Sequence, residues 1–254
     1  MKRLRFIFVV AASTLSVLIG MAGLLLLIAF YAHRSHDFRY APPVKSAIMG
    51  VKIYAVEHDG VYPALSSLPG RLMFDTDDMY PDYLAVPWLL MSHADPAWIE
   101  GKPDEYYFEN SSYFYLGYAV WNDEMVALFA DAYTKRIDEG LPFDTDLPVD
   151  SPIEQIRRLN DSVYRQMIPE SEANLPKWKS APDSEIPVFI ERPHSYPGAL
   201  GVYLFGPVIP LSRSAMGGNV AYKDGHIEFI KYPGKWPMTE ATIDALSRLE
   251  ALRK

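Results

Sequence analysis

Cysteine is missing from the whole 254-residue chain. Without thiols the chain can form neither a disulfide framework nor a thiolate metal site, and cysteine gives no clue to its redox compartment. Its folded part must therefore rely on an apolar core. With 49% apolar and 13% aromatic residues, the chain has enough material for one domain of ordinary size.

Clusters of basic residues are missing as well. The 24 Lys and Arg residues are scattered among 32 Asp and Glu residues, which leaves a formal net charge of -8. A phosphate-binding surface needs clustered cations with aromatic rings between them, so we expect no nucleic-acid partner.

The motifs of the common catalytic and cofactor-binding sites are also absent. The sequence contains no GxSxG, no Walker A motif, no GxGxxG after a predicted strand and no HExxH. We therefore expect no enzymatic activity, no catalytic residue and no cofactor.

One long uncharged run is present, from Phe6 to Ala32. About 20 apolar residues are enough to cross a bilayer as a helix. The three basic residues that precede the run favour a cytoplasmic N-terminus. The sequence thus predicts a single-pass membrane protein with a cytoplasmic N-terminus over 1–5, a transmembrane anchor over 6–32, a linker over 33–43 and a periplasmic or extracellular domain over 44–254.

Helical spacing of apolar residues occurs at four places after the linker. It predicts a helix over 44–57, which ends at Asp59-Gly60, where the glycine supplies a left-handed cap. Further helices are expected from Asn122 or Asp123 to about Glu139 and from Thr239 to the C-terminus. The fourth is expected to open at Ser151-Pro152, with Glu154–Arg158 and Asp161–Arg165 as exposed i,i+4 pairs.

Strand patterns lie between these helices. Half of the residues from Tyr106 to Trp121 are aromatic, which favours one or two strands, and the stretches 188–190 and 201–205 are also typical of strands. Two alternating runs flank Asp224-Gly225 and predict a β-hairpin over 219–230. From Leu65 to about Pro103 we expect loops with short elements. Apart from the anchor, the expected fold class is α+β, with an antiparallel sheet and several helices.

Few residues are candidates for binding. Carboxylates are the ligands that calcium prefers, and two clusters of them are weak calcium candidates, although neither has the spacing of an EF-hand. These aspartates are Asp75, Asp77 and Asp78 in one cluster and Asp144 and Asp146 in the other. Only His226 and Glu228 share a face of a predicted strand, and two ligands do not make a zinc site. Stacked aromatic rings could bind sugars, but bulk beneath a helix is the favoured interpretation.

Two stretches resemble the bacterial prepilin-like and type II secretion pseudopilin-like proteins. SAIMGVKIYAVEHDGVYPALSSL is similar to the family's membrane-proximal helix, which ends at Asp59-Gly60, and GGNVAYKDGHIEFIKYPGKWPMTE is similar to a C-terminal hairpin marked by a histidine, nine residues and Asp-Gly. Asp224 and Gly225 match this signature, and Ser214 stands at the histidine position. The leader differs, because Arg5 precedes Phe6 and Val10 stands where the family has glutamate.

The resemblance implies a divergent, membrane-anchored and non-enzymatic prepilin-like envelope protein. In its pilin-like domain, the helix at 44–57 would pack on an antiparallel sheet that contains the hairpin over 219–230, with further helices inserted. Its role would be structural or secretion-associated, with protein partners in the cell envelope. Two alternatives stay open on the residues alone: an anchored module that binds calcium or another ligand, and an enzyme that acts on glycans or peptides.

Overall fold

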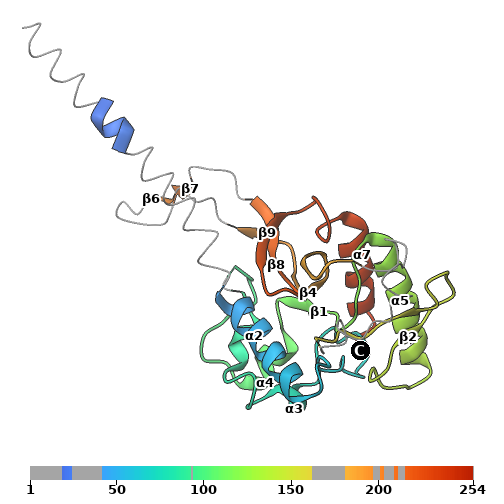
Figure 1. Cartoon of the computed structure of the whole chain (residues 1–254). Coiled ribbons are helices and arrows are strands. Elements are labelled where there is room, and N and C mark those ends of the chain that lie inside the picture. The colour runs from blue at the N-terminus through green and yellow to red at the C-terminus, as the bar shows by residue number, and fades with distance from the viewer. Residues whose placement is uncertain are drawn as a thin grey trace, which may run out of the picture. The chain divides into compact units, whose positions relative to one another are not determined.

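A computed structural model describes the chain in several stretches (Figure 1). The described residues are 19–24, 42–92, 94–161, 181–196, 201–202, 209–210 and 215–253. The chain divides into two units. One unit contains Met1–Arg39 with Pro197–Ser214, and its described part consists of a helix over 19–24 and an antiparallel pair of strands, β6 (Gly201–Val202) and β7 (Ile209–Pro210). The other unit contains Tyr40–Tyr196 with Ala215–Lys254.

The structure corrects the prediction of a membrane-spanning helix. It also corrects the single-pass topology, with a domain beyond the membrane, that depends on this helix. Within the described stretches, no helix has the length and the apolar character that crossing a bilayer requires. Of the expected anchor, only residues 19–24 are described, and they are helical. The rest of 6–32, residues 1–5 and the linker up to residue 41 lie outside the described residues. What the structure supports is a mixed helix-and-sheet fold with an antiparallel sheet.

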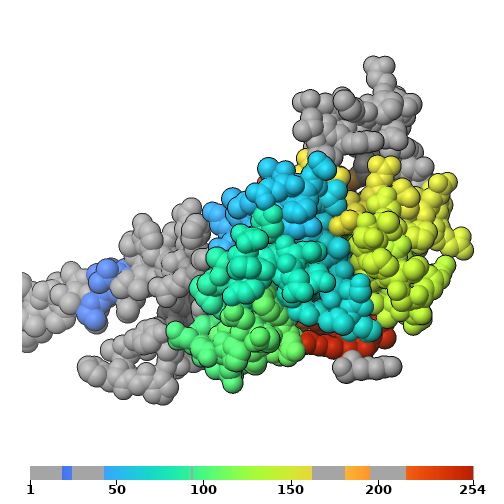
Figure 2. Space-filling view, turned by 90° about the horizontal axis from the view of Figure 1, so that it is seen from below, coloured from blue at the N-terminus to red at the C-terminus, as the bar shows by residue number. Residues whose placement is uncertain are grey.

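The helix expected over 44–57 is confirmed as α2 (Pro42–Glu57). It begins at two prolines, whose fixed φ suits the first turn of a helix. Its inner face buries Val44, Ile48, Val51 and Ala55, and its outer face forms part of the surface in Figure 2 (blue). After the helix, Asp59 and Gly60 have φ values of 55° and 83°, and the Gly60 amide donates to the Ala55 carbonyl at 2.7 Å.

The main sheet has five strands in the order β1-β4-β8-β5, with β9 paired to β8, and all its pairs are antiparallel. The strands are β1 (Tyr113–Tyr115), β4 (Pro187–Glu191), β5 (His194–Tyr196), β8 (Ala215–Tyr222) and β9 (Ile227–Lys231). The register places Phe114 beside Ile190 and Ile190 beside Val220. The expected strand at 188–190 and the hairpin over 219–230 are thereby confirmed.

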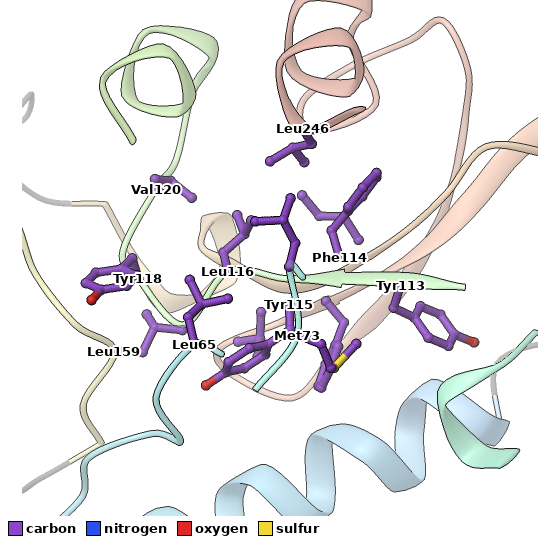
Figure 3. Close-up of a cluster of buried hydrophobic side chains, with 14 of the residues drawn as sticks. Leu65, Met73, Tyr113, Phe114, Tyr115, Leu116, Tyr118, Val120, Leu159 and Leu246 are labelled. Carbon is purple, nitrogen blue, oxygen red and sulfur yellow. The ribbon is translucent and has the colours of Figure 1, made fainter. Parts of the chain in front are cut away.

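The two faces of this sheet are covered by different helices. Side chains alternate along β1, so Tyr113 and Tyr115 point toward α2, whereas Phe114 points toward Leu246 (Figure 3). Leu246 belongs to α7 (Glu240–Glu250), which packs against α5 (Asp123–Asp138). These side chains are almost completely buried. The expected packing of α2 on the sheet that contains the hairpin is confirmed.

Both helices of the second layer begin at the caps that the sequence indicates. The Asn122 side chain accepts the Met125 amide at 2.8 Å and caps α5. The Thr239 hydroxyl accepts the Thr242 amide at 3.1 Å and caps α7. Such caps satisfy amides that have no partner within the helix.

The helix expected from Ser151 is wrong. The chain forms a turn there, Glu154 has a φ of 63°, and β3 (Gln155–Ile156) pairs with β2 (Leu147–Pro148). The helical spacing was misleading because Ile156 and Leu159 lie on an extended segment, and each of them is buried in the core without a helix. The second part of the expected helix, from residue 162 to the end of its apolar pattern at Met167, lies outside the described residues.

The aromatic stretch is only partly a strand. Residues 106–109 belong to a helix, α4 (Asp104–Glu109), and β1 follows it. Most of its rings are buried in the core, as the packing interpretation expected. The preceding region has the short elements expected for it, α3 (Thr76–Met79) and the 3-10 helix η1 (Pro87–Leu90). Of the strand expected over 201–205, only residues 201–202 are described.

Candidate functional site

The first aspartate cluster lies around α3 and does not form a cage of ligands. Asp75 caps the helix by accepting the Asp77 amide at 3.2 Å, and the three aspartates are exposed. Partial desolvation, followed by the negative charge of Asp75, raises the pKa of Asp78. These carboxylates repel one another at the surface, and the Asp75 side chain stabilises the helix end.

The second aspartate cluster is tied to Arg158. Asp146 accepts the Arg158 amide at 2.8 Å, and the Asp144 carbonyl accepts from the Arg158 guanidinium at 2.8 Å. Asp144 therefore contributes its backbone here rather than its carboxylate. In the part of the chain that the structure describes, no three His, Cys, Asp or Glu side chains gather as a metal ion would require.

The two Asp-Gly turns of the family-like segments meet at Asp161. The Asp161 amide donates to the Gly60 carbonyl at 2.7 Å, which fixes the turn after α2. Its carboxylate lies 3.7 Å from Nζ of Lys223, the residue directly before Asp224-Gly225. One residue thus joins the end of α2 to the turn of the β8–β9 hairpin. We call Lys52, Tyr62, Asp161, Asp183 and Lys223 the Asp161 cluster.

The charges of the Asp161 cluster are balanced. Lys52 donates to Asp161 at 3.2 Å, and Lys223 donates to Asp183 at 3.2 Å, so two lysines face two aspartates. Tyr62, which is fully buried, donates its hydroxyl to Asp161 at 2.9 Å. Burial and the neighbouring Asp161 charge strongly raise the pKa of Tyr62, so its hydroxyl stays protonated. The cluster therefore holds its elements together.

The hairpin turn is stabilised by its own side chains. Asp224 accepts both the amide of His226 at 3.0 Å and its ring Nδ1 at 2.6 Å, and the imidazole stacks on Tyr222 at 4.3 Å between ring centroids. Desolvation opposes ionisation of Asp224, but the hydrogen bonds from His226 outweigh it and lower the pKa of the carboxyl. Gly225 has a φ of 91°, which side chains rarely adopt. The turn is thus specified locally, and His226 is an exposed turn residue.

A serine, an aspartate and a histidine meet elsewhere in the same unit. The Ser112 hydroxyl donates to Asp95 Oδ2 at 2.6 Å, and His194 Nε2 lies 3.4 Å from the same oxygen. Ser112 is fully buried, whereas the side chains of Asp95 and His194 are each 11% exposed. Burial lowers the pKa of His194, although Asp95 partly offsets this effect.

The order of these three groups does not suit nucleophilic catalysis. In a Ser-His-Asp triad the imidazole takes the proton of the hydroxyl and the carboxylate orients the imidazole. Here the carboxylate lies in the middle, and the buried hydroxyl is already occupied, because it also accepts the Ser92 amide at 2.9 Å. The arrangement fixes the loop that contains Asp95, whose other oxygen accepts the Ala97 amide at 2.8 Å.

The residues that join the two turns are absent from the sequence-based candidates. Asp161 is assigned there to the exposed face of a helix, and Lys223 counts only as a neighbour of Asp224-Gly225. The signal in the sequence that could have indicated Lys223 was its place beside the hairpin turn, because a turn that packs on another element is held there by side-chain contacts. Its partner Asp161 lies 62 residues earlier in the chain, and only the tertiary fold brings the two residues together. Comparison with known proteins adds no relative, because no family model, curated protein or solved structure matches the chain.

Proposed function

We propose that this protein is a non-enzymatic, prepilin-like module with a structural or secretion-associated role that it performs by presenting surfaces to other proteins. The observation that carries the proposal is the packing of α2 on the sheet, with the end of α2 joined to the hairpin turn through Asp161. The resemblance implies the packing of the helix on the hairpin sheet, and the contact through Asp161 adds to it.

The use made of the polar side chains supports a scaffold. In the Asp161 cluster, the cations and anions are paired, and the tyrosine is a hydrogen-bond donor. The Ser112 hydroxyl is the group described above that most resembles a nucleophile. It donates to a carboxylate and accepts from a backbone amide. A catalytic group must instead be free to exchange a proton with substrate.

The proposal is tested with the groups that most resemble catalytic machinery. Wild-type protein and the variants Ser112→Ala and His194→Gln are assayed with panels of ester, peptide and glycoside substrates. We expect the three proteins to give the same background, because the imidazole described beside this hydroxyl, that of His194, contacts Asp95 rather than the hydroxyl. Turnover that exceeds background in wild type and is lost in Ser112→Ala would contradict the proposal.

A further inference from the structure

The outer face of α2 has an exposed apolar stripe. Met49, Ile53 and Val56 are 52%, 49% and 83% exposed, although the opposite face of the same helix is buried in the core. Their spacing of four and three residues places them in one row along the helix. Three large apolar side chains aligned on a helix form a surface of the kind that packs against another helix.

The charges beside this stripe oppose the dipole of the helix. Lys45 lies in the first turn and Glu57 is the last residue, and the helix has no acid in its first turn and no base in its last. A helix is stabilised by the reverse distribution, because its N-terminus carries partial positive charge and its C-terminus partial negative charge. The stability of α2 alone therefore does not explain this pattern. The pattern is complementary to that of a second helix running in the opposite direction.

We propose that α2 pairs with α2 of a second copy of this chain, antiparallel and around a two-fold axis. The proposal rests on the proposed function and names one partner of the scaffold. In this register Lys45 faces Glu57 of the partner subunit, and Met49 faces Ile53 of the partner subunit. The ion pair and the apolar contact each form twice by symmetry, and the two helix dipoles are opposed. The stripe is then covered by an identical stripe.

The size of the surface makes this a weak and reversible contact. A stable interface buries about 1,200–2,000 Å² in total, and one pair of 16-residue helices with three large apolar side chains each supplies less than that. We therefore expect the copies to exchange rapidly, so a covalent trap is the suitable measurement.

The absence of cysteine makes the trap clean, since each introduced thiol is the only one in its chain. Full-length Met49→Cys and Ile53→Cys are mixed and oxidised, and we expect a disulfide between them, because the register brings these positions together. Val56→Cys alone should not cross-link, because antiparallel α2 helices place the two copies of residue 56 about 15 Å apart along the axis, and a disulfide needs Cα atoms within about 7 Å. Leu68→Cys, at a position that is 56% exposed, measures random collision.

The outcomes separate the arrangements. A 49–53 product no more abundant than the Leu68→Cys product overturns the proposal, and efficient linkage of Val56→Cys to itself overturns it in favour of parallel helices. Neither result tests the proposed scaffold function, which would be contradicted by turnover that depends on Ser112.

Charge exchange tests the ion pairs separately. Lys45→Glu should lower the yield of the 49–53 disulfide roughly tenfold, since two symmetric pairs become repulsive. Combining it with Glu57→Lys should restore the yield. Glu57 also accepts the Tyr83 hydroxyl at 2.6 Å, so Tyr83→Phe controls for the loss of that bond and should leave the yield unchanged. Equal yields from wild-type charges and from Lys45→Glu would overturn the proposed pairing.

Discussion

Asp161 has more roles than its sequence context indicates. It lies between two turns, and both its amide and its two carboxylate oxygens have partners. Its side chain is 28% exposed. A carboxylate shared by two ammonium groups and a buried hydroxyl is worth more than an isolated surface ion pair, because removal of one partner leaves the others without compensation.

Replacement of Asp161 by Asn should therefore be costly. The amide has nearly the same shape and can still accept from Tyr62, but it no longer balances Lys52 and Lys223. We expect the free energy of unfolding to fall by about 1–3 kcal/mol. Urea denaturation measures this change, with Asp131→Asn on the exposed side of α5 as the matched control. Equal stability of the two variants would contradict the role assigned to Asp161.

His194 should make the protein sensitive to acid. Burial lowers its folded pKa below the unfolded value of 6.5, so above pH 6.5 the imidazole is neutral in both states and contributes no pH dependence. As the pH falls below 6.5, the unfolded chain takes up the proton first and the folded state loses stability, until the folded imidazole is itself protonated. His194→Gln should lose less stability between pH 7 and pH 5 than wild type in thermal melts. Parallel pH profiles of wild type and variant would refute this assignment.

At the residue scale, the sequence predicted side chains whose partners are local. The caps at Asn122 and Thr239 and the glycine of the hairpin turn depend on neighbours within a few positions. The joining roles of Asp161 and Lys223 could not be predicted, because they depend on positions far apart in the chain. The calcium interpretation of the aspartates found no support in the described residues, since a run of acids does not determine where its side chains converge.

At the element scale, α2 fits against its neighbours through a glycine. A Cβ added to Gly50 would lie 2.3 Å from the carbonyl oxygen of Tyr83, so the helix reaches the 79–83 segment only because residue 50 has no side chain. Helix propensity alone favours alanine here by about 1 kcal/mol. The backbone contact opposes it, and backbone cannot move away as a flexible side chain can.

We expect Gly50→Ala to destabilise the protein by about 1–2 kcal/mol despite its better helix propensity. The control is Ser247→Ala on the exposed face of α7, which should change stability by less than about 0.5 kcal/mol. Both are measured by urea denaturation. A Gly50→Ala variant more stable than wild type would show that α2 is not packed on the 79–83 segment as described.

The elements that the sequence predicted well are those whose own residues specify them. The hairpin has its Asp-Gly turn, and α5 and α7 have caps and one apolar face. The stretch after Ser151 has a helical apolar pattern, but pairing of β3 with β2 and burial of Ile156 determine its structure instead. In the aromatic stretch, α4 contains three successive aromatic residues, because burial of rings does not distinguish a helix from a strand.

At the scale of the whole molecule, the central claim is that α2 and the β8–β9 hairpin belong to one cooperative unit joined through Asp161. The division of the chain supports this, since residues 40–196 and 215–254 form one unit although they are separated in sequence. The resemblance to prepilin-like proteins predicted the helix on the sheet from two short segments. It did not predict α5 and α7 on the opposite face, or the residues that connect the segments.

Hydrogen exchange followed by mass spectrometry tests this claim most directly. Amides of 44–57 and of 217–231 are compared in wild type and in Asp161→Asn. In a cooperative unit both segments open in the same unfolding event, so we expect them to exchange in the same slow class and to be accelerated by the same factor in the variant. Exchange of the two segments at unrelated rates, or acceleration of only one of them, would contradict the account.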